Sequence, residues 1–121
     1  MLSASHRLSA AGEFRQAVRQ GRRAGGPLVV VHLATGYVDK ATSRPGDPEA
    51  PRVGFVVSKA VGPAVTRNQV KRRLRHLMRE RVGRLEDGAL LVVRAQPAAA
   101  GASYRDLAAE LDRCLDRVVG S

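Results

Sequence analysis

The clearest candidates for chemistry are basic and polar side chains that recur every three or four residues between positions 66 and 81. These side chains are Arg67, Asn68, Lys71, Arg72, Arg75, His76 and Arg79. On a helix this spacing places them on one face, where like charges repel one another. Eight Lys or Arg residues stand between positions 67 and 84 against a single acid, Glu80. We therefore expect an anionic partner for this face, and phosphate groups fit it best.

A helix over residues 66–81 would position these side chains. Its core-facing stripe, at helical period, consists of Val70, Leu74, Leu77 and Met78. Thr66 is the expected N-cap, and Gln69 three residues later completes a capping-box pattern. The exposed N–H groups of such a helix start add to Arg67 and Asn68 as a place for a phosphate.

The composition limits the classes of protein to consider. The chain has 121 residues and a formal net charge of +10, which predicts one domain over residues 1–121 and a polyanionic partner. No apolar run approaches the length of a membrane span, and the first residues lack a signal-peptide pattern, so we expect no membrane partner and a cytoplasmic location. The three histidines and the single Cys114 have no metal-ligand spacing. We therefore expect no cofactor bound by the protein alone, and we expect Cys114 to be a small core or boundary residue, not a nucleophile.

The first half of the chain predicts one helix and two strands. A short amphipathic helix is expected over residues 9–20, followed by a buried strand over residues 28–33 that is rich in β-branched residues. Residues 36–52 carry three prolines and many polar residues, which is typical of a mobile loop. A second strand is expected over residues 53–58, and the loop before it allows antiparallel pairing with the first strand.

The second half predicts a strand and a final helix after the basic helix. The strand covers residues 89–94, and Ser103 with Asp106 forms a capping-box-like start for the last helix. One face of that helix would carry Leu107, Leu111, Cys114, Leu115 and Val118. The expected fold is therefore α+β, with three helices packed on a small, mostly antiparallel sheet in the order α-β-β-α-β-α.

An ordered set of residues within and before the basic helix resembles the protein subunit of bacterial ribonuclease P. The matching positions are Lys59, Gly62, Ala64, Val65, Arg67, Asn68, Lys71, Arg72 and Arg75. The match extends to Arg7, Leu8, Phe14 and Gly21, to residues 53–59 and to residues 92–94. Many nucleic-acid-binding proteins have a basic helix, but this order inside matching flanks is far more specific.

The resemblance implies an enzyme that removes the 5′ leader of precursor tRNA, with the chemistry performed by a catalytic RNA and Mg²⁺ held through that RNA. It implies one protein per RNA, with the catalytic RNA and precursor tRNA as partners and no catalytic residue in the protein. The implied RNA-binding residues are Lys59, Arg67, Asn68, Lys71, Arg72, Arg75 and Arg79. The implied leader cleft, between the first helix and the sheet, holds Phe14, Val18, Val31 and Ser58. The implied fold resembles ribosomal protein S5 domain 2 and has a left-handed βαβ crossover around the basic helix.

The sequence departs from the family at the cleft, where only Phe14 keeps an aromatic ring and Val18 and Val31 stand at positions usually aromatic. Stacking therefore cannot be the main source of leader affinity. The alternative function is a non-catalytic protein of ribosomal-protein type that binds structured RNA. A DNA-binding helix is disfavoured because no helix-turn-helix partner precedes it. A membrane-surface helix is disfavoured because the apolar stripe carries no Trp or Phe.

Overall fold

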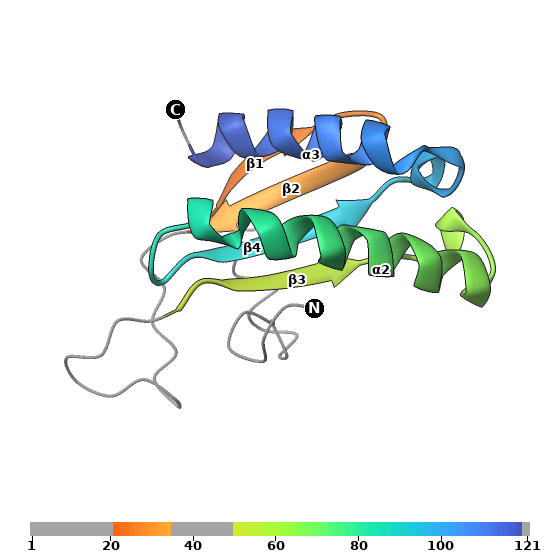
Figure 1. The fold of residues 1–121 in the computed structure, drawn as a ribbon, viewed down its shortest axis with the longest axis horizontal. Helices are drawn as coiled ribbons and strands as arrows, with labels where there is room; N and C mark the ends of the chain where they lie inside the picture. The colour runs from red at the N-terminus through yellow and green to blue at the C-terminus, as the bar shows by residue number, and fades with distance from the viewer. Residues whose placement is uncertain (1–20, 35–49, 120–121) are drawn as a thin grey trace.

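The computed structural model describes residues 21–34 and 50–119, in which four strands form one sheet and two α-helices pack on it. The strands are β1 (Arg22–Gly25), β2 (Val29–Ala34), β3 (Arg52–Val56) and β4 (Leu90–Ala95). The helices are α2 (Ala64–Arg81) and α3 (Tyr104–Val119), and short 3₁₀ turns are η2 (Lys59–Val61), η3 (Val82–Arg84) and η4 (Pro97–Gly101). The predicted helix over residues 9–20 lies outside the described residues. An α+β fold is confirmed, with two α-helices in the described part (Figure 1).

The strand order is β1-β2-β4-β3, and it corrects the predicted pairing. β2 pairs antiparallel with β4, whereas β3 pairs parallel with β4 and has no ladder with β2. All residues of β2 and β4 except Arg94 are buried, a pattern typical of central strands. β3 starts at Arg52 and is only half-buried at Phe55 and Val56, as suits an edge strand. The sheet is therefore mixed, and β3–α2–β4 is a crossover between adjacent parallel strands.

β1 was not predicted from the sequence, in which Arg22 and Arg23 belong to a second basic cluster on and after the predicted first helix. It pairs antiparallel with β2 and forms an edge of the sheet in the described part of the chain. The predicted end of the loop over residues 36–52 is also wrong by one residue, because Arg52 begins β3. The rest of that loop up to residue 49 lies outside the described residues.

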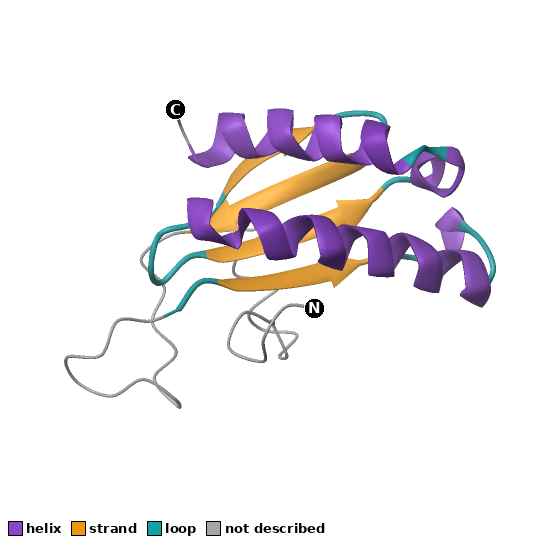
Figure 2. Ribbon diagram, in the orientation of Figure 1, coloured by secondary structure: helices purple, strands orange, loops and turns teal. Residues whose placement is uncertain are grey.

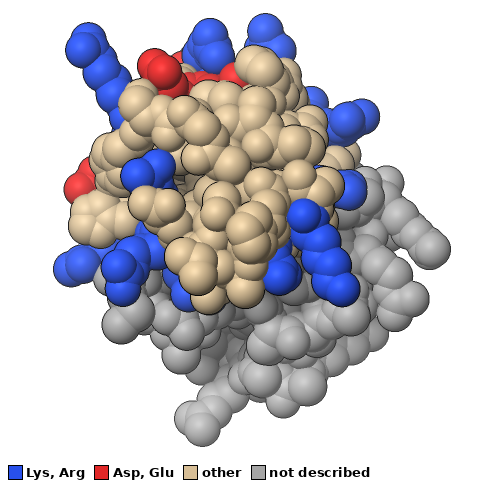
Figure 3. Space-filling view, turned by 90° about the vertical axis from the view of Figure 1, so that its right-hand side faces the viewer, with Lys and Arg blue, Asp and Glu red and all other residues tan. Residues whose placement is uncertain are grey.

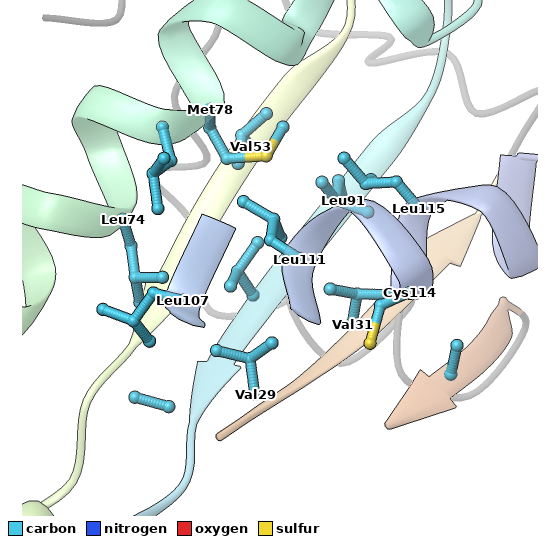
Figure 4. Packing of buried hydrophobic residues seen from close by; sticks show 14 of the residues in the cluster. Val29, Val31, Val53, Leu74, Met78, Leu91, Leu107, Leu111, Cys114 and Leu115 are labelled. Carbon is cyan, nitrogen blue, oxygen red and sulfur yellow. The ribbon is translucent and has the colours of Figure 1, made fainter. Parts of the chain in front are cut away.

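Both helices cover the same face of the sheet (Figure 2). The predicted apolar stripes of α2 and α3 are buried there, which confirms both patterns. Figure 4 shows α3 residues Leu111 and Cys114 packed over the sheet near Val31, while Met78 of α2 lies near Val53. Ser103 Oγ accepts the N–H of Asp106 at 3.0 Å, so the predicted start of α3 is confirmed. These contacts fix α2 as a rigid element whose opposite face carries the basic residues.

Candidate nucleic-acid interface

The start of α2 is set by Gly62 and Pro63, and the predicted cap at Thr66 is wrong. The helix begins at Ala64, and Pro63 is the N-cap residue with an extended backbone. Proline is tolerated at a helix start because it has no N–H to leave unpaired. Gly62 has φ +152°, a conformation that favours glycine, and a Cβ there would come within 3.2 Å of the Thr66 side chain. Arg67 closes this turn, because its Nε donates to the Gly62 carbonyl at 3.1 Å.

Arginines on the flank of α2 that faces α3 have partners within the fold. Arg81 Nε donates to Asp112 Oδ1 at 2.6 Å and its Nη2 to Oδ2 at 3.2 Å, a bidentate pair. This hydrogen bond lowers the pKa of Asp112 and raises the pKa of Arg81. Arg84, which follows α2, donates a single hydrogen bond from Nη2 to Asp116 Oδ1, and Arg73 donates to the Ala102 carbonyl at 3.2 Å. The charge on this flank therefore serves to join α2 to α3.

The outer face of α2 is different, because its basic side chains surround a hollow. Its volume is about 350 Å³, and it is lined by Asn68, Lys71, Arg72, Arg75 and His76. Among the described residues, no carboxylate lies within ion-pair distance of these three cations. The end of the molecule where α2 begins shows many more Lys and Arg than acidic side chains (Figure 3). Such a hollow has the size, charge and hydrogen-bond donors to receive phosphate groups.

The remaining predicted RNA-binding residues flank this hollow. Lys59 is exposed on η2, one turn of chain before α2, and Arg67 is half-buried at the helix start. Arg79 is exposed one helical turn beyond Arg75. The structure therefore brings Asn68, Lys71, Arg72 and Arg75 together around one hollow and places the other three predicted residues on the same helix and its entry turn.

Of the predicted leader-cleft residues, Phe14 and Val18 lie outside the described residues and Ser58 is exposed after β3. Val31 requires a correction, because its side chain is 0% exposed within the core between the sheet and the helices. Side chains alternate between the two faces of a strand, so a shift of one residue reverses the assignment. Val31 is a core residue and cannot line an open cleft.

Two arginines on the other face of the sheet were not assigned to a site from the sequence. His32 lies opposite Arg23 in the β1–β2 ladder, and Arg94 is paired with the adjacent Val30. Both arginines are exposed, and burial together with their charges lowers the pKa of His32. The detectable signal was a charged residue inside the apolar run of β4, which marks a solvent-facing position in a strand. This second positive patch lies on the side of the sheet opposite α2 and α3.

The described residues offer little for metal or covalent chemistry. Among them, no group of three or more His, Cys, Asp or Glu side chains is placed to hold a metal ion. Cys114 is buried, as predicted, and burial raises the pKa of its thiol. Neither helix of the described part is long and apolar enough to cross a membrane.

Comparison with known proteins agrees with the fold and with the motif. The family model described as Ribonuclease P matches residues 2–119. The ribonuclease P protein component of Nocardioides sp. is 58% identical over 118 residues, covering 98% of this chain and 95% of the relative. That of Streptomyces avermitilis is 55% identical over 121 residues, covering 99% and 97%.

Solved structures match in fold. The RNase P protein of Staphylococcus aureus gives a TM-score of 0.76 at 21% identity, covering 93% of this chain and 94% of that one. The RNase P protein from Thermotoga maritima gives 0.72 at 22% identity, covering 93% and 96%. With the full-length match of sequence to the family model and to its members, these findings show that the chain belongs to the ribonuclease P protein family.

Proposed function

We propose that the outer face of α2 is the surface by which this chain, as the protein subunit of ribonuclease P, binds the catalytic RNA. The observation that carries the proposal is the division of charge on α2. Arginines toward α3 are paired with carboxylates or a carbonyl, whereas Lys71, Arg72 and Arg75 surround an open hollow. Cations that the fold leaves without a carboxylate, within the described residues, are available to phosphates. Lys59, Arg67, Asn68 and Arg79 extend the same surface.

In this proposal the protein contributes binding and the RNA contributes catalysis in processing the 5′ end of tRNA. Three acidic side chains of α3 support this division, because they already hold the fold together. Asp112 and Asp116 bind Arg81 and Arg84, and the buried carboxylate of Glu110 accepts two backbone N–H groups. Mg²⁺ would be held by the RNA and would stabilise the developing charge on the cleaved phosphodiester. The protein cations would arrange phosphates around it.

The precursor leader would lie on the sheet face opposite the two helices. Arg23 and Arg94 flank His32 there, so phosphate contacts are available on this face without aromatic rings on β2. Phe14, Val18 and Ser58 stay part of the proposed leader path, and Val31 is withdrawn from it.

The left-handed sense of the β3–α2–β4 crossover and the likeness to ribosomal protein S5 domain 2 belong to the same proposal. In Figure 1, β3 and β4 run toward the right, α2 returns in front of them, and β4 lies above β3. That arrangement supports the left-handed sense, against the general preference for right-handed crossovers. A single domain over residues 1–121, a cytoplasmic location and one protein per RNA complete the proposal. Sedimentation of the reconstituted complex would test its stoichiometry.

The deciding experiment is reconstitution with the catalytic RNA, using two variants that each lose two positive charges. Lys71→Gln/Arg72→Gln changes the hollow, and Arg113→Gln/Arg117→Gln changes exposed positions on acid-balanced α3. The first variant should bind the RNA at least about tenfold more weakly, because hydrogen bonds from charged groups contribute about 1.5–3 kcal/mol each. Its log–log salt slope should fall in magnitude by about 1.4–1.8, for two lost phosphate contacts.

The control variant should keep wild-type affinity and slope, and both should keep the wild-type circular dichroism spectrum. Equal affinities for the two variants would show that α2 is not the binding face. Cleavage of precursor tRNA only in the presence of the catalytic RNA would separate this function from that of a ribosomal-type RNA-binding protein.

A further inference from the structure

Tyr104 is an aromatic residue that lies outside the hydrophobic core. The chain has two Phe, two Tyr and no Trp, and in the described part Phe55 packs against the core. Tyr104 is instead 39% exposed at the first position of α3. The start of α3 is held by Ser103, and the buried face of α3 is formed by other residues, so Tyr104 is not part of the core cluster.

His76 links this ring to the hollow on α2. The His76 and Tyr104 ring centroids are 6.1 Å apart with their planes at 61°, an edge-to-face contact. In such a contact at least one face of each ring is left uncovered by the other ring. His76 also lines the hollow formed with Asn68, Lys71, Arg72 and Arg75. One ring of this pair thus lines the hollow, and the other, partly exposed, lies against it on the side of α3.

This combination matches the two parts of a nucleotide. Bases without a pairing partner stack on aromatic side chains, and their phosphates bind Arg and Lys. Double-helical RNA would offer phosphates to the hollow but no free base face to the rings. Aromatic rings beside cations therefore favour an unpaired nucleotide over double-helical RNA.

We propose that Tyr104 and His76 form a stacking platform for an unpaired base of the catalytic RNA, whose phosphate lies in the adjacent hollow. The proposal rests on the RNA-binding role of α2 and makes it more specific. The platform is on the helix-covered side of the sheet, whereas the proposed leader path is on the opposite face. A base bound here therefore belongs to a different RNA segment from the leader.

A fluorine probe can observe the platform directly. Tyr37 and Tyr104 are the only tyrosines, so 3-fluorotyrosine in a full-length Tyr37→Phe variant gives one ¹⁹F signal, from Tyr104. A short single-stranded RNA should shift this signal upfield through the ring current of a stacked base. An abasic oligonucleotide of equal length and charge should bind the hollow without that shift. The same response to both oligonucleotides, or none while both bind, would overturn the proposal.

An independent measure of base stacking is the ratio of two affinities, that for the base-bearing oligonucleotide and that for the abasic one. Tyr104→Ala should reduce this ratio at least about fivefold, near the lower end of one base–aromatic stack, and His76→Ala should reduce it less. Tyr104→Phe should preserve it, because the ring remains. Val65→Ala is the matched control, since Val65 is an exposed apolar side chain on α2 without a ring. An unchanged ratio in a folded Tyr104→Ala protein would refute the platform.

The outcomes separate this inference from the proposed function. If the abasic oligonucleotide binds and Lys71→Gln/Arg72→Gln weakens it, while Tyr104→Ala leaves the ratio unchanged, only the platform fails. If Lys71→Gln/Arg72→Gln changes binding of neither oligonucleotide nor catalytic RNA, the α2 interface itself fails. In the holoenzyme, Tyr104→Ala should affect substrates with and without a leader by the same factor. A loss confined to leader-bearing substrate would assign Tyr104 to the leader path and contradict the proposal.

Discussion

Replacing Glu110 by alanine tests whether one buried carboxylate holds the β1–β2 hairpin against α3. Glu110 is 2% exposed, and its Oε2 accepts the backbone N–H groups of Leu28 and Val29, each at 2.6 Å. The turn fits closely around the carboxylate, since a Cβ on Gly26 would lie 2.5 Å from Oε1. The hairpin places Arg23 on the sheet, so the contact supports part of the proposed leader path.

The expected loss follows from these two hydrogen bonds. Bonds to a charged group contribute about 1.5–3 kcal/mol each, so Glu110→Ala should lower the free energy of unfolding by about 3–6 kcal/mol. That is a large part of the stability of about 5–15 kcal/mol typical of a domain. Glu110→Gln keeps one oxygen acceptor without the charge and should lose about 1–3 kcal/mol.

Urea unfolding followed by circular dichroism measures these differences. The midpoint of Glu110→Ala should fall by more than about 1 M, with the slope m unchanged. Glu86→Ala is the matched control, because Glu86 is exposed, and it should stay within about 0.5 kcal/mol of wild type. A Glu110→Ala protein as stable as this control would show that the carboxylate does not hold the hairpin.

Three further predictions follow from single contacts. The pKa of Asp112 is lowered mainly by its hydrogen bond from Arg81, so its contribution to stability is present above the ordinary aspartate pKa of about 3.9 and is lost as pH falls below it. Asp112→Asn should therefore reduce stability at pH 7 and flatten the acid limb of a stability–pH curve; an unchanged acid limb would contradict the pairing. Val31→Tyr should overpack the core and cost at least about 1–3 kcal/mol in urea unfolding, and wild-type stability would place Val31 outside the core. Gly62→Ala should cost about 1–3 kcal/mol through strain at positive φ, and wild-type stability together with wild-type affinity for the catalytic RNA would show that this turn does not position α2.

Elements with their own periodic pattern were predictable from the sequence. The buried stripes of α2 and α3 were identified residue by residue, because a helix that covers a sheet repeats its apolar positions at 3.6 residues. The family was predictable because its motif is an ordered series on one helix. In both cases the information lies within a short stretch of chain.

Features that depend on distant residues were not predictable in this way. β1 is a strand because β2 supplies its ladder and Glu110, more than 80 residues away in sequence, holds the turn. Its Arg22 and Arg23 give no apolar alternation. Pairing of β3 with β4 likewise depends on which strand occupies the centre of the sheet, and β4, buried on both faces except at Arg94, lies between β2 and β3. Because β2 and β3 are neighbours in sequence, they were predicted to form an antiparallel pair, which the structure does not contain.

The sequence also could not show which basic side chains of the site pair within the fold. The sequence identified a helix crowded with cations, but it could not separate those that bind α3 from those that face outward. Arg81 and Arg84 find their carboxylates about 30 residues further along the chain. Only the packing of α3 against α2 decides which cations are used in the fold and which are left for a ligand.

Register within β2 decides where a single-stranded ligand can lie. Val29, Val31 and Leu33 pack under the helices, so Val30, His32 and Ala34 face the other side. Under the proposed function, the leader therefore meets the exposed Arg23 and Arg94, which flank the buried His32, whereas the catalytic RNA meets α2 across the sheet. Ser58 and Lys59 follow edge strand β3 and precede α2, so they lie where these two faces meet. Under the proposed function, a substrate strand that passes from the catalytic RNA to the leader path would cross this edge, where Lys59 would be placed to contact it.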